Sequence, residues 1–368
     1  MRSPIKILDR YIARKFLGVF SFIILLFTII IVIFDYAENV DSFITNKAPW
    51  SAIINDYYLN FVPSMINQFS GLFTFITVIW FTSKMASQTE IVAILSSGVS
   101  FRRILRPYLF SSILITLMSL GLGLWVIPQS SNKIVEFQSK YIQRKKLQAS
   151  KYDEHIYRQI DNDVFVYIRY FSGESNHASF FAIERYNGTE LIETLEASNA
   201  LFIPETQHWT APQYTIRRKI DDENNEFSLE KYTKLDTLIN INAMELGRVE
   251  ELIRTLDIEQ LNLFIAQQKA KGSDMINVFE VERQQRYSYP FSIIILTLMG
   301  VSLASPKKRG GTGLNLGVGI VLCFTYIMAA KVAEEFAKGD LLPAQISVWL
   351  PNILFTFIAI YLYKKAPK

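Results

Sequence analysis

The chain has 368 residues, a mean hydropathy of +0.19 and a net charge of +4, and half of its residues are hydrophobic. Its basic residues are divided among loops between apolar segments. This gives no support for nucleic-acid binding, which would need them gathered on one face of a soluble domain. The single cysteine, Cys323, excludes a disulfide within the chain.

Six apolar runs are candidates for membrane spans, because a helix needs about 20 apolar residues to cross the hydrocarbon core. The fourth and sixth are short, and we expect the fourth to continue as a helix through Arg283–Tyr289 and the sixth to begin nearer Leu342. In chain order the runs are Phe16–Phe34, Val62–Phe81, Tyr108–Ile127, Pro290–Ala304, Leu314–Ala333 and Val348–Tyr363.

The Lys and Arg residues between these runs predict their orientation, since basic residues favour the cytoplasmic side. The first run is preceded by five such residues, Arg2, Lys6, Arg10, Arg14 and Lys15. The loop after the second run, the loop after the fourth run and the C-terminus are also basic, whereas the short loops on the other side are mostly acidic. We therefore expect a multi-pass protein of the inner membrane with both termini in the cytoplasm and the central segment outside it.

Between the second and third runs lies a polar segment, Ser87–Pro107, that is too structured for a simple loop. Ser87-x-x-Glu90 is typical of a capping box, in which two side chains bond the free N–H groups at a helix start. An apolar stripe of Ile91, Ile94 and Leu95 follows, and Gly98 is a typical helix stop. A second helix is expected to start at Ser100, with a basic cluster of Arg102, Arg103 and Arg106.

The central segment, Gln129–Ser288, predicts a β-rich domain outside the cytoplasm. It contains 20 Lys and Arg against 25 Asp and Glu, a net charge of −5. Asn187-Gly188 predicts a hairpin, and strand-length segments separated by turns indicate a sandwich, a jelly roll or an open barrel. The expected strands are Val164–Phe171, Ser179–Tyr186, Leu191–Phe202, Gln213–Ile220 and Phe227–Ile239.

Helices are expected on both sides of these strands. Gln129–Gln148 extends the third span, and Asp257–Lys271 forms a surface helix that Gly272 ends. The expected architecture is an α+β membrane protein with six transmembrane helices, three on each side of an inserted jelly-roll-like domain. Its parts are residues 1–128, with the coupling helix at 87–107, then 129–288, then 289–368.

The sequence contains little that indicates catalysis. His155, His177 and His208 are isolated from one another, so neither a metal site nor a cofactor is expected. The glycine-rich segment 310–319 lacks the strand and the Gly-Lys-Ser/Thr of a phosphate loop. We interpret Gly313-x-x-x-Gly317 as a place where two helices approach closely. The chain is thus expected to be a non-catalytic subunit, with ATP hydrolysed by another protein.

Charged residues at the outer ends of spans are costly in a membrane and are therefore candidate functional groups. Asp35 and Glu38 end the first span, and Lys331, Glu334 and Glu335 end the fifth. They predict a shared depth near the outer headgroups, where they either are solvated at the interface or form the polar rim of a lipid-binding cavity. Asn67 and Gln68, inside the second span, are expected to form hydrogen bonds between helices.

Five segments carry a pattern that extends over nearly the whole chain. They are Leu8–Ile12 (LDRYI), Ser87–Gly98 followed by Pro107, Trp125–Pro128, Leu261–Gly272 and Glu282–Pro290. In their order and spacing they resemble the LptF/LptG (YjgP/YjgQ) family of lipopolysaccharide export permeases.

The resemblance implies that such a chain pairs with a second LptF/LptG-like permease on a dimer of an LptB-like ATPase. It also implies extraction of lipopolysaccharide to a periplasmic bridge, with an LptC-like partner. Glu90 matches the acidic residue of the helix that docks on the ATPase, so Glu90, Ile91, Ile94, Leu95, Gly98, Arg102 and Arg103 are the candidate coupling residues. The acidic residues Asp35 and Glu38 stand where LptG-like members carry basic residues that meet lipid phosphates.

Two alternatives stay open. One is a permease subunit of another ATP-driven exporter of lipid or lipoprotein, which would share the coupling helix. The other is a membrane scaffold that transports nothing and would not need such a helix.

Overall fold

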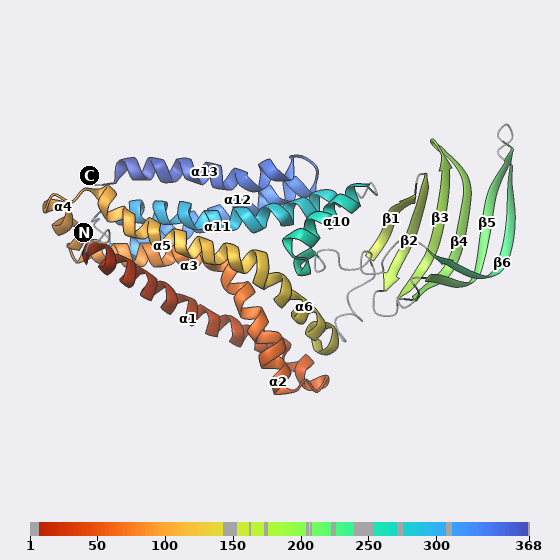
Figure 1. The fold of residues 1–368 in the computed structure, drawn as a ribbon, viewed down its shortest axis with the longest axis horizontal. Coiled ribbons are helices and arrows are strands. Elements are labelled where there is room, and N and C mark those ends of the chain that lie inside the picture. The colour runs from red at the N-terminus through yellow and green to blue at the C-terminus, as the bar shows by residue number, and fades with distance from the viewer. Residues whose placement is uncertain are drawn as a thin grey trace. The chain divides into compact units, whose positions relative to one another are not determined.

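The computed structural model describes residues 7–142, 153–161, 163–172, 176–203, 206, 208–221, 226–238, 253–270, 275–306 and 311–366. The chain divides into two compact units (Figure 1). Met1–Phe137 and Asn277–Lys368 form the first, here called the helical unit, and Gln138–Ile276 form the second, the strand unit. The predicted domain boundaries at 128/129 and 288/289 fall within helices of the structure.

The described part of the chain contains six helices that are long and apolar enough to cross a membrane, as predicted. The fourth helix begins at Ile276 and the last at Ala344, so both extensions expected from the sequence are confirmed. The helices are α1 (Ile7–Thr45), α2 (Trp50–Ala52), α3 (Leu59–Ser87), α4 (Glu90–Ser96), α5 (Phe101–Gly121), α6 (Ile127–Phe137), α11 (Ile276–Ala304), α12 (Gly311–Lys338) and α13 (Ala344–Lys365).

Three π-helical segments join or extend these helices, and they lengthen two of the spans. Ile53–Tyr58 connects α2 to α3, and Leu122–Val126 connects α5 to α6. Gln138–Ile142 then continues α6, which confirms the predicted extension of the third span as far as residue 142. The rest of that prediction, 143–148, lies outside the described residues.

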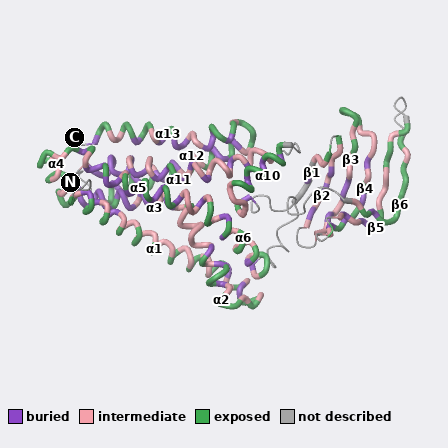
Figure 2. The backbone as a smooth tube through the Cα atoms, viewed as in Figure 1, coloured by how far each residue is buried: buried purple, intermediate pink, exposed green. Residues whose placement is uncertain are grey.

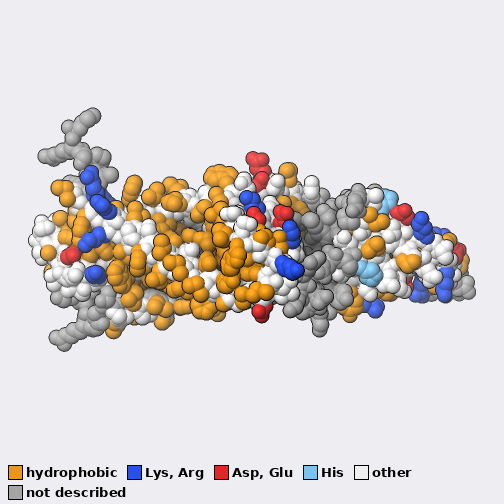
Figure 3. Space-filling model, turned by 90° about the horizontal axis from the view of Figure 1, so that it is seen from below, with side chains coloured by type: hydrophobic (Ala, Val, Ile, Leu, Met, Phe, Trp, Pro, Cys, Tyr) orange, Lys and Arg blue, Asp and Glu red, His pale blue; other side chains and the backbone are white. Residues whose placement is uncertain are grey.

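The helical unit is built around α11, whose apolar window is 67% buried, whereas that of α1 is only 6% buried (Figure 2). Polar side chains join the helices inside the apolar core. The Ser119 hydroxyl donates to Asn67 Oδ1 at 2.7 Å, as predicted for Asn67, and Asn352 Nδ2 donates to the Ser288 carbonyl at 2.9 Å. Figure 3 shows exposed apolar side chains forming a band on one face of this unit, with Lys and Arg at its α4 end.

Close approach of α12 to α3 occurs at Gly319, not at the predicted pair. A Cβ at Gly319 would lie 2.1 Å from Ile79 Cδ1, while a Cβ at Gly313 or Gly317 would meet nothing within 4 Å. The interpretation of Gly313-x-x-x-Gly317 as the helix contact within this chain is therefore wrong. Both glycines are exposed, because they lie on the side of α12 that faces away from α3.

The strand unit contains one antiparallel sheet of six described strands that pair in chain order (Figure 1). The inserted β domain is thus confirmed, and its described strands form a meander without the Greek-key crossovers of a full jelly roll. The Asn187-Gly188 hairpin is confirmed, with Asn187 paired to Glu190. The strands are β1 (Asp153–Asp161), β2 (Val164–Ser172), β3 (His177–Asn187), β4 (Glu190–Ile203), β5 (His208–Asp221) and β6 (Glu226–Leu238).

Backbone pairing is interrupted at neighbouring positions on successive strands. The sheet bends along this line, so that a single sheet surrounds its core. Phe180 and Lys234 have positive φ angles of 56° and 72°, and no Cα pair is formed at either residue. Across the line, buried positions on one strand are three residues apart instead of two, as in Ile168 and Phe171, Ala178 and Phe181, and Ala197 and Ala200. β2, β3 and β4 thus change the face that they bury where they bend.

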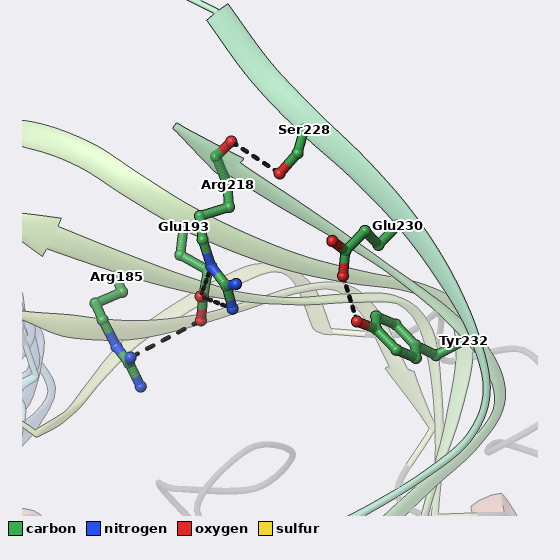
Figure 4. Close-up of polar contacts among 6 residues, drawn as sticks. All are labelled: Arg185, Glu193, Arg218, Ser228, Glu230 and Tyr232. Atoms are coloured by element: carbon green, nitrogen blue, oxygen red, sulfur yellow. Dashed lines mark hydrogen bonds and ion pairs between the residues drawn. The ribbon is translucent and has the colours of Figure 1, made fainter. Parts of the chain in front are cut away.

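Trp209 lies at the centre of that core and is fully buried. Its ring stacks on Phe181 at 5.2 Å and contacts Phe202 at 5.3 Å and Phe171 at 5.9 Å. Outside the core, strands are joined by exposed ion pairs such as Arg218 with Glu193 at 2.8 Å (Figure 4). Such pairs contribute about 0–1 kcal/mol each, so apolar packing dominates the stability of the sheet.

The helix expected after the strands is α10 (Ile258–Ala270). Its start has the reciprocal bonds of a capping box: Gln260 N–H donates to Asp257 Oδ1 at 2.8 Å, and Asp257 N–H donates to Gln260 Oε1 at 3.1 Å. Leu261 and Ile265 are buried, as the predicted apolar side requires.

Candidate functional site

The segment that connects α3 to α5 is a short helix between two sharp breaks. Thr89 precedes α4 with φ of 61°, and Gly98 follows it with φ of 84°, a conformation that favours glycine. The predicted stop at Gly98 and new start at Ser100 are confirmed. The capping box at Ser87 is wrong, because α3 continues through Ser87 and the Ser87 hydroxyl donates to the Lys84 carbonyl at 2.8 Å.

The apolar stripe of α4 packs on its own helical unit. Ile91 is buried, and Ile94 and Leu95 are half-buried against the same apolar cluster, which also contains Ile12 and Phe101. The stripe therefore anchors α4 to the bundle. The opposite side of the helix is exposed at Val92, Ala93 and Ser96. The predicted coupling residues were chosen along the apolar stripe, so none of them lies on this exposed side.

Glu90, the first residue of α4, is half-buried and belongs to a chain of polar contacts. The Tyr11 hydroxyl donates to Glu90 Oε2 at 3.2 Å, and the Lys15 ammonium donates to the Tyr11 oxygen at 2.6 Å. An acid at a helix start is also favoured by the helix dipole. Glu90 therefore lies at the edge of the exposed side of α4 with one oxygen already engaged.

The two predicted coupling arginines are both bonded within the chain. Arg103 forms an ion pair with Asp9 of α1 in which both side chains are mostly buried. Arg102 Nε donates to the Tyr363 hydroxyl of α13 at 3.1 Å. Asp9, Tyr11 and Tyr363 were not among the predicted site residues, because their sequence neighbourhoods do not show which helix they meet.

A second group of charged residues lies at the opposite end of the helical unit. Asp35 accepts hydrogen bonds from Tyr57 at 3.0 Å, Tyr58 at 3.1 Å and Asn39 at 3.3 Å. These bonds tie α1 to the start of the second span, so Asp35 has a structural role in this chain. Glu38, one turn further along α1, is exposed.

On α12, Glu334 is mostly buried between two lysines, with Lys331 Nζ at 2.8 Å and Lys338 Nζ at 3.0 Å. The Lys331 side chain remains 61% exposed. Figure 1 shows α1 and α2 splayed away from α12 and α13 toward this end of the unit. The Lys331 contacts thus lie within α12, whereas those of Asp35 join α1 to the segment Ile53–Tyr58.

The described residues contain no group of three or more His, Cys, Asp or Glu side chains that could hold a metal ion. His208 is paired with Asp236 across two strands, with 2.6 Å between Nδ1 and Oδ1. What the geometry provides is an anchored surface helix at one end of a bundle and charged groups at the other.

Comparison with known proteins gives a match over almost the full length. A family model described as lipopolysaccharide export system permease LptF/LptG matches residues 10–365. The chain is 20% identical over 369 aligned residues to the lipopolysaccharide export system permease protein LptG of Escherichia coli (strain K12), covering 98% of each protein. It is 21% identical to the protein of the same name from Haemophilus influenzae (strain Rd), covering 95% of this chain and 96% of that protein.

Proposed function

Because the chain belongs to the lipopolysaccharide export permease LptF/LptG family, we propose that it is a transmembrane subunit of an ATP-driven exporter. In this proposal it extracts lipopolysaccharide from the inner membrane and passes it to a periplasmic bridge. The observation that carries the coupling part is α4, a helix held to the bundle on one side and exposed on the other.

We place the cytoplasm at the α4 end of the helical unit. Arg10, Arg14 and Lys15 near the start of α1, the arginines at the start of α5, and Lys364 and Lys365 in the last turn of α13 all lie at this end (Figure 1), which agrees with the charge rule for membrane proteins. The strand unit, which is inserted between α6 and α11, then lies in the periplasm. This orientation makes α4 accessible to a cytoplasmic LptB-like ATPase dimer.

In this arrangement the coupling residues have two different roles. Ile91, Ile94 and Leu95 transmit force into the bundle, because they pack in its apolar cluster. The surface that meets the ATPase is the exposed side of α4, with Glu90 at its edge to bind a basic residue. The paired LptF/LptG-like permease completes the cavity, and ATP-driven closure narrows it.

In this proposal the outer charged groups contribute to lipid binding in different ways. Lys331 is the group we assign to a lipid phosphate, because its side chain is largely exposed and Glu334 keeps a second lysine beside it. Glu38 and Glu334 form part of the polar rim. Asp35 positions α1, since its oxygens accept three hydrogen bonds from within the chain. An LptC-like protein is the expected acceptor of the lipid.

The test of coupling is Glu90→Ala in the complex isolated from membranes through a tag on this chain. We expect less ATPase to be recovered with the tagged chain, by about tenfold, because a partly buried charge pair across an interface contributes more than ~1.4 kcal/mol. Val92→Glu, on the exposed side of α4, should have the same effect. Glu335→Ala, an exposed acid at the other end of the unit, is the matched control.

Recovery of the ATPase at the control level in both α4 variants would refute the coupling role of this helix. Lipid extracted from the purified complex separates the remaining alternatives. Lipopolysaccharide supports the proposal, whereas lipoprotein or phospholipid without lipopolysaccharide would indicate a different exporter. A complex without any ATPase would favour the scaffold.

A further inference from the structure

The N-terminal end of α1 is joined to the α4–α5 segment by two kinds of contact. Ile12 and Phe16 of α1 are fully buried in the same apolar cluster as Ile91 of α4 and Ile104 of α5. Phe16 also lies 5.8 Å from the ring of Tyr108, between ring centroids. A close-packed cluster transmits displacement because it deforms little.

Two polar contacts fix the register of this packing, one to each of the two helices. Asp9 pairs with Arg103 of α5, and the exposed fractions of their side chains are 12% and 21%. Tyr11 pairs with Glu90 of α4. Because Asp9 and Tyr11 are two residues apart on one helix, a shift of α1 along its axis or about it would break both contacts. Apolar attraction is non-directional, so it selects this register less sharply than the two polar contacts do.

The rest of α1 is held much less. Only 6% of its apolar window is buried, and exposed side chains such as Phe22, Leu25 and Ile33 continue along it. A Cβ at Gly18, just beyond the cluster, would meet nothing within 4 Å. The buried residues of α1 therefore lie at its two ends: Asp9, Ile12 and Phe16 near α4, and Asn39 and Phe43 beyond Asp35.

We propose that Asp9, Arg103 and Tyr11 are positioning residues that clamp α1 to the α4–α5 segment, so that a push on α4 displaces α1 together with α3 and α5. This inference rests on the proposed function, because it assumes that a partner pushes on α4. The least buried helix of the bundle thereby becomes part of the moving unit. The Tyr11 hydroxyl also bonds the Glu90 carboxylate that we assign to ATPase docking. Glu90 therefore belongs both to the clamp and to the docking surface.

Distance measurement between two spin labels tests the clamp in the complete complex. Cys323 is fully buried, so labels can be directed to cysteines introduced at Gly18 of α1 and Phe110 of α5, both exposed. We expect one narrow distance distribution that is the same without nucleotide and with ATP plus vanadate. With Asp9→Asn, the distribution should shift or broaden when ATP and vanadate are added.

The second readout is the amount of lipopolysaccharide released per ATP hydrolysed. Asp9→Asn and Arg103→Lys should lower this ratio by about tenfold, the effect of a coupling energy within the range found for contacting residues. Recovery of the ATPase should stay near that of the unaltered complex. Arg106→Gln, an exposed arginine one turn further along α5, is the matched control, and Asp9→Arg combined with Arg103→Asp should restore the ratio.

A purely structural role would lower the thermal stability of the chain without changing the release ratio of the molecules that remain folded, and that result would overturn the clamp. So would a label distance that changes with nucleotide in the unaltered complex as much as in Asp9→Asn. Failure of the proposed function looks different, because the unaltered complex would then contain no ATPase or release no lipopolysaccharide.

Discussion

Replacing Trp209 with alanine tests whether the interior of the strand unit is a packed core. The Trp209 ring is fully buried and contacts three other rings at 5.2–5.9 Å between centroids. Truncating such a residue costs about 3–5 kcal/mol, from lost apolar burial and the cavity that remains. That is a large part of the 5–15 kcal/mol by which a typical domain is stable.

Hydrogen–deuterium exchange of the full-length protein measures this loss strand by strand. Amides of β3, β4 and β5 that exchange only on global opening should exchange roughly 10²- to 10⁴-fold faster in Trp209→Ala. Leu229→Ala is the control, because Leu229 lies on β6 of the same sheet and is 63% exposed. Its effect should stay below about tenfold, or 1.4 kcal/mol.

Equal exchange in the two variants would refute this reasoning. It would mean that Trp209 packs too loosely to hold the sheet together.

Two further predictions concern helix packing and a tyrosine. Gly319→Val should destabilise the purified chain by about 1–3 kcal/mol, because the added carbons overlap Ile79. Gly317→Val, the control, should change the thermal midpoint little. Equal shifts in the two variants would contradict the contact assigned to Gly319. Burial and the hydrogen bond to Glu184 raise the pKa of Tyr157 above its ordinary value of 10. The folded state therefore holds this proton more tightly, and the resulting stabilisation is complete below pH 10 and is lost as the pH rises above it. In the folded protein Tyr157 should stay protonated between pH 10 and 11, so it should not contribute to the ultraviolet titration in this interval. Tyr157→Phe should therefore show the same absorbance change there as the unaltered protein, and a smaller change would contradict the raised pKa.

The spans and most strands could be predicted because they depend on local signals. A run of apolar residues indicates a span, and the strands from Val164 onward contain many β-branched and aromatic residues. β1 was missed, since its sequence DEHIYRQID is largely polar and its place depends on pairing with β2. The bend at Phe180 and Lys234 also left no local signal, as neither residue favours a positive φ.

The candidate site was predictable in position but not in its contacts. The breaks at Gly98 and Ser100 follow from local chemistry, and so does the acid at the start of α4. The apolar stripe indicated the buried side of α4, but not that Ile12 and Phe101 pack against it, because other parts of the chain bring them there. The same holds for Gly319, because the sequence shows a small residue without showing whether another helix lies beside it.

The most direct test of the account is lipid transfer by the complex purified through a tag on this chain and placed in proteoliposomes with lipopolysaccharide. The quantity measured is the lipopolysaccharide crosslinked to a soluble periplasmic acceptor, with and without ATP. If this chain is a subunit of an ATP-driven exporter, crosslinking should increase with ATP, and the increase should be lost with Glu90→Ala. Equal crosslinking with and without ATP, in a complex that hydrolyses ATP, would contradict it.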